Sequence, residues 1–543
     1  MPYIDITTMR GEMPRVLSHV LPDGFSMLAS NCHFRFGVIT PVSDDEKSNI
    51  TFGIKPETIF QYRQDKWFTW PGIVDAVRSP VAQDPYGRVY YTDGKYPKFT
   101  SAQIATSGTG PYPANSYRLG VPTPGSAITC IVLNPPSVEG AEEEDAKDDE
   151  TRFYTQTFVT AYGEEGAPGP ESMEVTVQKG GSVDLTMQPP PLQNSNITRR
   201  RIYRSVSGGG NADFLLVTEL DAGVLSFHDD LHAEQLGPVL ETEHYVMPPD
   251  NMTGLCMMAN GIAAGFAGNE VMFSEAFLPY AWPDAYRQTT AEDIVAIASI
   301  GTALVVTTKG EPYLFSGVSP ANISGAKLPL TQACVSRQSM VVMDGFVLYA
   351  GTNGLVSVDG AGNAVIATEK IISPEQWREM FNPSSVKAYQ YRGEYVARYT
   401  KTDGSQAVFI FNPQDMDIRH MNTTFDTAYN DTATDTLYLV KGRELFVSQG
   451  SNTPLPLLWR SKTFIAQDNT SFSCLRIKAP YPERVGISVF ADGQPVIQLP
   501  PGTLSGSVLK LPSVTGREWY LEVSGFGQVE RITLSTSMPE MPA

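Results

Sequence analysis

Gly393-Glu-Tyr-Val-Ala-Arg-Tyr-Thr-Lys-Thr-Asp-Gly-Ser-Gln-Ala-Val-Phe-Ile-Phe411 is one of five similar stretches between Gly254 and Ser451. Each stretch is an apolar run, a tight turn with glycine and a second apolar run; the other four are 261–274, 302–316, 345–358 and 436–447. Glycine adopts the positive φ that tight hairpin turns need, so Lys-Gly, Asn-Gly and Asp-Gly between β-rich runs indicate hairpins. The region therefore repeats one hairpin unit five times.

The distance between these turns indicates a fold class. The turn glycines are Gly268, Gly310, Gly354, Gly404 and Gly442, and successive ones lie 42, 44, 50 and 38 residues apart. A hairpin that recurs at roughly 40–50 residues is typical of a β-propeller with one four-stranded blade per period. Because the spacing is irregular and no WD or kelch signature occurs, a multi-sheet β-solenoid or stacked sandwiches remain alternatives.

Composition supports an all-β protein and argues against a nucleic-acid-binding function. The chain has 543 residues, is 41% apolar and is rich in glycine and proline, which suits several β-domains with many turns. Helical periodicity is scarce; the best case, Pro374–Phe381, predicts about two turns. The net charge is −19, which argues against binding nucleic acid by phosphate neutralisation.

Cysteine usage and the first residues lead us to expect a product folded in cytoplasm. Five cysteines are far apart and none forms a C-x-x-C pair, so reduced, buried thiols are expected rather than disulfides or zinc. Residues 1–5 lack the features of a signal peptide. The longest uncharged apolar run, 294–308, is too short to span a bilayer as a helix. We expect no membrane span.

Changes of pattern divide the chain into five predicted parts. These are an N-terminal docking segment at 1–45, first propeller blades at 46–124, an inserted β-sandwich at 126–245, the remaining blades at 246–452 and a C-terminal β-sandwich at 453–543. Hairpin-like units at 58–70 and 87–100 would be two early blades, which with the five later ones make a ring of about seven. Within the docking segment, residues 26–41 are expected to change from a short helical stretch to an extended one.

The inserted part has the strand pattern of a small sandwich. Seven short strands are predicted at 127–133, 153–162, 173–177, 182–187, 199–205, 214–218 and 224–229. Their number and spacing fit an Ig-like or fibronectin type III sandwich. Phe158–Ser172 resembles a fibronectin type III strand followed by its Pro/Gly loop, and Arg201–Ser205 resembles a later strand of that module. The C-terminal part has six such strands and an Asp492-Gly493 hairpin turn.

Few residues are candidates for chemistry. His228 and His232 are an i, i+4 pair, but at the end of a strand they would lie about 13 Å apart, which suits a polar loop better than a metal site. The acidic run 139–150 lacks the EF-hand pattern and is expected to be a solvated loop, with calcium or a basic partner as alternatives. Arg199, Arg200 and Arg201 alternate faces of a strand and cannot form one surface.

Motifs of known enzyme classes are missing from the sequence. No G-x-S-x-G, H-E-x-x-H or Walker A motif occurs, and Ser207–Gly210 reads as a flexible loop rather than a phosphate cradle. Ser357–Gly362 comes closest to the turn of sialidase-type propellers, but its glycines are out of place and no Trp follows. We therefore predict no catalytic, cofactor-binding or metal-binding residues, no cofactor, and a protein that is not an enzyme.

Several short N-terminal sequence segments, taken in their order, resemble a known protein family. Met9–Arg15, Leu21–Gly24, Ala29–Cys32 and Gly37–Pro41 together look like the opening of tail proteins of short-tailed bacteriophages. Later phrases are also similar to this group: 75–82, 88–94, 117–122, 269–275, 281–283 and 382–385. In that family such a lead runs into a β-propeller. The resemblance is strongest over 1–120 and 246–400, and no single motif in it is specific.

The resemblance implies a structural virion protein, the tail tubular or nozzle protein of podoviruses. It implies a ring of identical subunits, six in number, around the channel through which viral DNA is ejected without sequence-specific binding. Other tail proteins, such as an adaptor and fibres, would be its partners. The fibronectin-like insertion departs from the simplest nozzle, so a tail tube or fibre-docking adaptor remains open. The net charge predicts an acidic channel lining, from which DNA is repelled.

Two other classes of function compete with this interpretation. A receptor-binding tail module would use the same domains without a channel. An enzyme would be a propeller glycosidase, such as a virion-borne depolymerase that acts on cell-surface glycans. With 59 acidic residues, a pair of carboxylates suited to glycoside hydrolysis cannot be dismissed by counting.

Overall fold

The computed structural model describes the chain except residues 1–2, 135–148, 206–212, 505, 507 and 542–543. The described chain is almost entirely β, and its α-helices are α1 (Ala102–Ala105) and α2 (Pro374–Phe381). Contacts divide it into two compact units. Unit 1 comprises 1–72, 304–314 and 326–543, and unit 2 comprises 73–303 and 315–325. No described helix has the length and apolar character needed to cross a membrane.

The five predicted hairpin turns each lie between two paired strands. Four of the pairs are β21–β22 (Ala263–Ala267, Glu270–Phe273), β29–β30 (Phe346–Ala350, Leu355–Asp359), β33–β34 (Glu394–Thr400, Gln406–Asn412) and β37–β38 (Thr436–Lys441, Glu444–Val447). The fifth is β25 (Ala303–Thr308) with β26 (Tyr313–Ser316), whose sheet also contains β24 (Ile294–Ile300) and β27 (Ser324–Lys327). Local turn chemistry therefore identified these five hairpins of the repeat region.

In unit 1 these hairpins extend into four-stranded antiparallel arrays. One is β28–β31, with β28 (Val341–Val342) and β31 (Ala364–Ile366) outside the hairpin. Strands β32 (Lys387–Tyr391), β33, β34 and β35 (Asp417–Met421) form a second such array, which is one end of a ten-stranded sheet. Helix α2 follows β31 where predicted. Ser373 caps it: its side chain accepts a hydrogen bond from Gln376 N–H, and its own N–H donates to the Gln376 side chain.

The last array of the repeat is completed by a strand from the start of the chain. Strand β5 (Glu46–Thr51) pairs antiparallel with β38, next to β37 and β36 (Thr427–Asp431). The pairing places Glu46 opposite Val447 and Thr51 opposite Glu444. Strands β6 (Thr58–Arg63) and β7 (Lys66–Trp70) form the hairpin predicted at 58–70. The stretch 46–51 thus belongs to the last hairpin array of the repeat.

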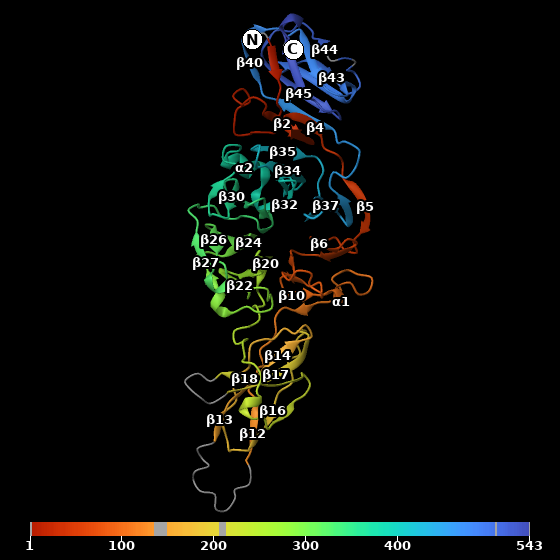
Figure 1. Ribbon diagram of the computed structural model, residues 1–543. Helices are drawn as coiled ribbons and strands as arrows, with labels where there is room; N and C mark the ends of the chain where they lie inside the picture. Colours follow the sequence, from red (N-terminus) through yellow and green to blue (C-terminus); the bar gives the residue numbers. More distant parts are fainter. Residues whose placement is uncertain (1–2, 135–148, 206–212, 505, 507, 542–543) are drawn as a thin grey trace, which may run out of the picture. The chain divides into compact units, whose positions relative to one another are not determined.

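The C-terminal part of unit 1 is a sandwich to which the N-terminus contributes strands. One sheet is β1-β46-β41-β44, formed by Tyr3–Ile6, Arg531–Ser535, Cys474–Lys478 and Val508–Lys510. The other is the continuation of the ten-stranded sheet beyond β35, where β2 (Ser26–Ser30) pairs in parallel. It contains β2, β39 (Leu457–Ser461), β45 (Gly516–Gly525), β42 (Val485–Ala491), β43 (Gln494–Leu499) and β40 (Phe464–Thr470). Figure 1 shows both chain ends among these strands. The short helical stretch predicted within 26–41 is wrong, because residues 26–30 are the paired strand β2.

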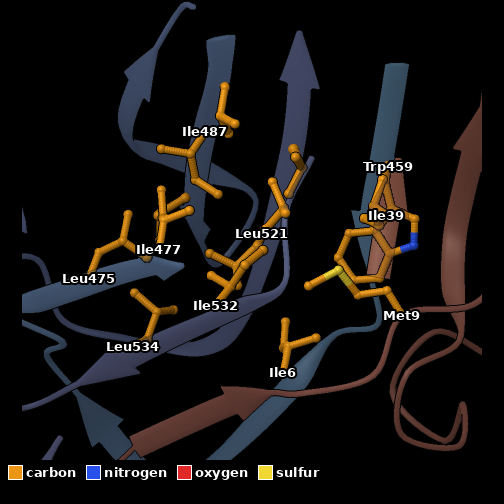
Figure 2. Packing of buried hydrophobic residues seen from close by; sticks show 14 of the residues in the cluster. Ile6, Met9, Ile39, Trp459, Leu475, Ile477, Ile487, Leu521, Ile532 and Leu534 are labelled. Atoms are coloured by element: carbon orange, nitrogen blue, oxygen red, sulfur yellow. The ribbon is translucent and has the colours of Figure 1, made fainter. Parts of the chain in front are cut away.

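One apolar cluster fills this sandwich. Figure 2 shows Ile532 and Leu534 of one sheet beside Leu521 and Ile487 of the other. The N-terminal segment supplies further members of the same cluster: Ile4, Ile6, Met9, Ala29, Cys32 and Ile39. The hairpin β3–β4 (Cys32–Arg35, Val38–Pro41) contributes two of these. The N-terminal segment therefore belongs to the core of the C-terminal sandwich, because burial of its apolar side chains requires the strands at the other end of the chain.

Unit 2 contains two further antiparallel sheets of four strands. One is β8 (Asp75–Arg78), β9 (Val89–Thr92), β10 (Pro97–Thr100) and β11 (Tyr117–Arg118). The other is β20 (Thr253–Met257), β21, β22 and β23 (Gln288–Thr289). The hairpin predicted at 87–100 is β9–β10. Residues from both sheets, including Tyr90, Phe99, Leu255 and Met272, share one apolar cluster.

The predicted insertion consists of two three-stranded sheets in unit 2. They are β12-β16-β19 (Thr129–Leu133, Ser182–Thr186, Ser226–Asp229) and β14-β17-β18 (Tyr154–Thr160, Ile197–Ser205, Phe214–Asp221). A two-stranded pair, β13–β15 (Glu150–Arg152, Val175–Val177), completes it. Each of the seven predicted stretches contains a strand. Both sheets contribute to one cluster, with Val183 and Leu185 from the first and Tyr154 and Ile202 from the second, so they pack face to face.

Candidate functional site

A polar pocket of unit 1 lies where the N-terminal hairpin β3–β4 meets β33 and β35. It has a volume of about 240 Å³ and is lined by His33, Phe34, Arg35, Arg392, Gly393, Glu394, Asn412, Gln414, Asp415, Asp417 and Arg419. Alternate residues of β35 point into it because strand side chains alternate between faces. Titratable groups gathered in a pocket are the usual starting point for a site hypothesis.

A buried ion pair organises this pocket. The two terminal nitrogens of Arg419 donate to the two carboxylate oxygens of Glu394 at 2.7 and 2.6 Å, a bidentate pair. Arg419 is only 2% exposed. Its Nη2 also lies 3.2 Å from His33 Nδ1, and His33 Nε2 lies 3.0 Å from Gln449 Oε1. The pair therefore holds the histidine ring between an arginine and an amide.

Burial shifts the pKa of two groups here in opposite senses. Loss of solvation, helped by the charge of Arg419, lowers the pKa of His33 to about 4. Loss of solvation raises the pKa of Asp417 to about 6, although a hydrogen bond from Gly11 N–H and the charge of Arg419 oppose this. At neutral pH His33 is neutral, and Asp417 titrates close to neutrality. Burial also raises the pKa of the Cys32 thiol to about 12, so Cys32 stays protonated.

The same residues join the N-terminal segment to β35. Gly11 N–H donates to Asp417 Oδ2 at 2.8 Å. The backbone of Glu12 exchanges two hydrogen bonds with Ile418, and its carboxylate accepts from Ala29 N–H at 2.7 Å. Each of these bonds links residues that only the fold brings together. The arrangement can hold two chain segments rigidly, and it also places an acid of near-neutral pKa in a polar pocket.

A second cluster of charges lies inside the sandwich of unit 2. Asp229 Oδ2 accepts hydrogen bonds from Arg204 Nη1 and from the Tyr154 hydroxyl, both at 2.7 Å. Arg204 also donates to the Leu231 carbonyl at 3.0 Å. All three side chains are at most 1% exposed. Burial, followed by the charge of Asp229, raises the pKa of the Tyr154 hydroxyl, which therefore remains a donor. Arg152 joins the same cluster, because its Nη1 lies 3.8 Å from Asp229 Oδ2 while its Nε donates to Glu150 Oε2 at 2.8 Å.

The histidines singled out in the sequence do not meet. His228 lies at the end of β19, where its Nδ1 is 2.6 Å from Asp184 Oδ1 on the neighbouring strand, and this contact raises its pKa. His232 follows after the strand, and its backbone N–H donates to the side chain of Gln235. Within the part of the chain that is described, no three metal-binding side chains come together.

The other sequence candidates have local roles where they can be placed. Arg199 and Arg201 both bond Glu219, whereas Arg200 between them is buried and bonds Gln156, which confirms the predicted alternation. Asp359 accepts hydrogen bonds from its own turn. Most of the acidic run, 139–148, and the whole of Ser207–Gly210 lie outside the described residues. All five cysteines are free.

Sequence reasoning missed the residues of the polar pocket. Asp417 and Arg419 stand at alternate positions of a strand flanked by apolar residues, and this was the available signal. Two charges on the same strand face inside an apolar region need partners, and those partners, Glu394 and Gly11, lie 25 and 406 residues away. Local patterns carry no information about pairing over such distances.

Comparisons with known proteins give fold-level likenesses of low similarity. No protein-family model matches the chain, and no curated protein matches it. Among solved structures, an exo-β-1,3-galactanase from Phanerochaete chrysosporium is similar at 9% identity over 52% of this chain and 95% of that one, with a TM-score of 0.20. The WD40 domain of Toxoplasma gondii coronin is similar at 9% identity over 60% of this chain and 79% of that one, with a TM-score of 0.26. These TM-scores identify no family. The strands of the structure show an all-β protein of many sheets.

Proposed function

We propose that this chain is a structural subunit of a short-tailed bacteriophage tail, the nozzle or tail tube, which forms a ring around the DNA ejection channel. The observation that carries the proposal is how the chain start is built into unit 1. Strand β1 pairs with β46, β2 lies between β35 and β39, and β5 completes the array of β36–β38. A subunit tied together in this way resists being pulled open.

Physical requirements of a channel protein agree with such a construction. Pressurised DNA exerts force on the channel wall, so each subunit must keep its shape under mechanical load. This role requires no catalysis. Antiparallel pairing between the two ends of a chain means that separation requires several strands to break together. Pairing also covers strand edges that would otherwise associate with other chains. The N-terminal phrases that resemble podovirus tail proteins, including Met9–Arg15 and Gly37–Pro41, lie within this construction.

The proposal includes a finer description of the fold. The four-stranded arrays at β28–β31, β32–β35 and β36-β37-β38-β5 would be blades of a β-propeller, with β5 as the strand that closes it. The β12–β19 sandwich would be a fibronectin type III-like insertion that docks fibres or adaptors. Six copies would form the ring. With a net charge of −19, acidic side chains would line the lumen and DNA would pass without sticking.

Tail assembly tests the proposal. Disrupting the gene should yield particles without complete tails, and supplying the intact chain should restore them. Negative-stain images of tails should show closed rings with an axial hole of DNA width, decorated by an antibody to this chain. If intact particles lack the chain altogether, the proposal fails. A lumen that is basic in the assembled ring would refute the acidic lining alone.

A second candidate function is favoured by the polar pocket. Glu394, Asp415 and Asp417 line it together, and a carboxylic acid with a pKa near 6 is suited to act as a general acid in glycoside hydrolysis. The chain would then be a virion-borne depolymerase. The test is release of reducing sugar from host envelope glycans, which Asp417→Asn should abolish. Without any sugar release from the intact chain, this candidate is excluded.

A further inference from the structure

The hairpin β3–β4 ends in an unusual turn. Arg35 and Val38 are paired, so Phe36 and Gly37 alone form the loop, and their φ values are 55° and 78°. Positive φ at both positions defines the type I′ turn, which favours Asn-Gly. A bulky aromatic residue is disfavoured there, because its Cβ crowds the backbone in the left-handed region. Folding of the subunit alone gives no reason for phenylalanine at this position.

The side chain of Phe36 is also completely exposed, at 102%. Phe277 provides a contrast, since it too has a positive φ, 62°, but its ring packs on Gly261 of its own unit. The ring of Phe36 makes no such contact within the described chain. A strained turn that presents an aromatic ring to solvent indicates that the ring is buried in another molecule.

Next to this ring stands a positive charge. Arg35 is exposed, lines the rim of the polar pocket and forms no ion pair with any described residue. The chain as a whole carries a net charge of −19. A second copy therefore offers abundant carboxylates to Arg35, and complementary charge favours this encounter.

The same N-terminal segment carries an exposed apolar patch. Leu17 is 69% exposed, Val20 57% and Met27 39%. Thr463 joins the two ends of this stretch, because its N–H donates to the Ser18 carbonyl at 3.1 Å and its hydroxyl lies 3.8 Å from the Met27 sulfur. A turn brings Val20 back to Leu17, since the Val20 N–H donates to the Leu17 carbonyl at 3.0 Å. Asp23, whose side chain is 94% exposed, lies in the same segment and is paired with Lys462. We call Leu17, Val20 and Met27 the lead patch.

We propose that Phe36 of one copy of this chain packs on the lead patch of the next copy, with Arg35 beside Asp23. Phe36 and the lead patch are different groups of residues, so the contact joins unlike surfaces of two copies and can repeat from copy to copy. The inference rests on the proposed function, because a contact of this kind would build the closed ring of copies proposed above. It assigns that contact to the β3–β4 hairpin.

The test is sedimentation of the full-length chain over a range of concentrations, with Phe36→Asn as the main variant. Asparagine suits the type I′ turn, so this variant should melt at the same or a higher temperature than the wild type, and should lose at least tenfold in self-association. Phe36→Leu should retain most of the association. Tyr481→Asn, which removes another exposed aromatic of unit 1, should leave association unchanged.

A mixing experiment identifies the receiving surface. Leu17→Asp should remove the patch, so this variant alone and Phe36→Asn alone should both stay monomeric. In a mixture, the Leu17→Asp variant supplies the Phe36 side chain and the Phe36→Asn variant supplies the lead patch. The two should therefore form a one-to-one pair that grows no further. A wild-type chain that stays monomeric, a Phe36→Asn variant that associates normally, or a mixture without pairs would each overturn the inference. The chain's presence in virion tails is measured separately, so failure of this contact is distinguishable from failure of the tail function.

Discussion

Two sandwiches in this protein have different interiors. The C-terminal sandwich of unit 1 is filled by aliphatic and aromatic side chains such as Leu521 and Ile532. The β12–β19 sandwich of unit 2 also buries Arg204, Asp229 and Tyr154. An apolar interior stabilises the fold in proportion to the area removed from water, so each buried side chain makes its own contribution to the free energy of unfolding. A buried ionic network is stable only when every member is present, since one missing partner leaves an uncompensated charge.

The largest expected effect follows from breaking the ionic network. Asp229→Ala leaves Arg204 buried without its carboxylate and should destabilise the β12–β19 sandwich by about 3–5 kcal/mol. All six tryptophans lie outside 126–245, so their fluorescence does not report on this region. Hydrogen exchange of peptides from β17 and β19 is the suitable measurement. Unchanged protection in these peptides would show that the network contributes little.

Two controls sharpen this result. Asp184→Ala removes the exposed partner of His228 on the same sandwich and should change stability by no more than about 0.5 kcal/mol. Replacing three members together, with Arg204→Met, Asp229→Leu and Tyr154→Phe, should cost less than Asp229→Ala, because Arg204 is removed with its partner and Arg152 keeps Glu150. If the triple variant were as unstable as Asp229→Ala, the contrast between the two interiors would be lost.

A truncation in the apolar interior should have a smaller effect than loss of Asp229. Leu521 is fully buried, and Leu521→Ala should cost about 2–4 kcal/mol through lost burial and a residual cavity. Trp459 and Trp519 belong to the same cluster, so denaturant unfolding followed by tryptophan fluorescence measures it directly. Ile465→Ala, at a partly exposed position of β40, is the matched control and should cost clearly less. Equal losses at both positions would contradict the assignment of this core.

The polar pocket predicts pH effects of opposite sign from two residues. The pKa of His33 is lowered to about 4, so between pH 6.5 and 4 the unfolded chain binds a proton that the folded chain refuses, and stability is lost as pH falls. From pH 7 to 5 this loss is about 2 kcal/mol. His33→Gln should remove it. The measurement is the free energy of unfolding at both pH values for the variant and the wild type.

Asp417 should act in the other direction. Its pKa is raised to about 6, so the folded chain takes up the proton first, and stability is gained as pH falls from 7 to 5, by about 1 kcal/mol. Asp417→Asn should eliminate this gain, so the variant should lose more stability on acidification than the wild type does. Identical pH profiles of the variant and the wild type would show that Asp417 ionises normally in the folded protein.

The smallest effect comes from a local feature outside both interiors. Ser373 caps α2 through the hydrogen bond that its side chain accepts from Gln376 N–H, and Ser373→Ala should cost about 1 kcal/mol. Ser373→Asp keeps an acceptor at this position and should restore most of the loss. Thermal unfolding followed by tryptophan fluorescence is suitable because Trp377 lies on this helix and is buried. A Ser373→Ala loss comparable to that of Leu521→Ala would mean that the cap supports more than its helix.

Sequence patterns predicted the parts of this protein that depend on neighbouring residues. The hairpins around Gly268, Gly354, Gly404 and Gly442, the two turns of α2 and the alternation of Arg199–Arg201 all agree with the structure. Each rests on backbone conformation or side-chain direction over a few residues. One local error, the helical stretch predicted within 26–41, arose because pairing of β2 with β39 outweighed a weak helical preference.

What the sequence by itself determined, then, is the all-β character, the hairpin repeat, the turns and the acidic charge. Tertiary structure alone decided that β5 completes the array of β36–β38, that the N-terminal segment lies in the C-terminal core, and that Gly11 meets Asp417. It also decided which charges are buried and therefore which pKa values shift. The physical reason is distance along the chain: pairing across about four hundred residues is selected by the burial of the whole core, and no local stretch records that selection.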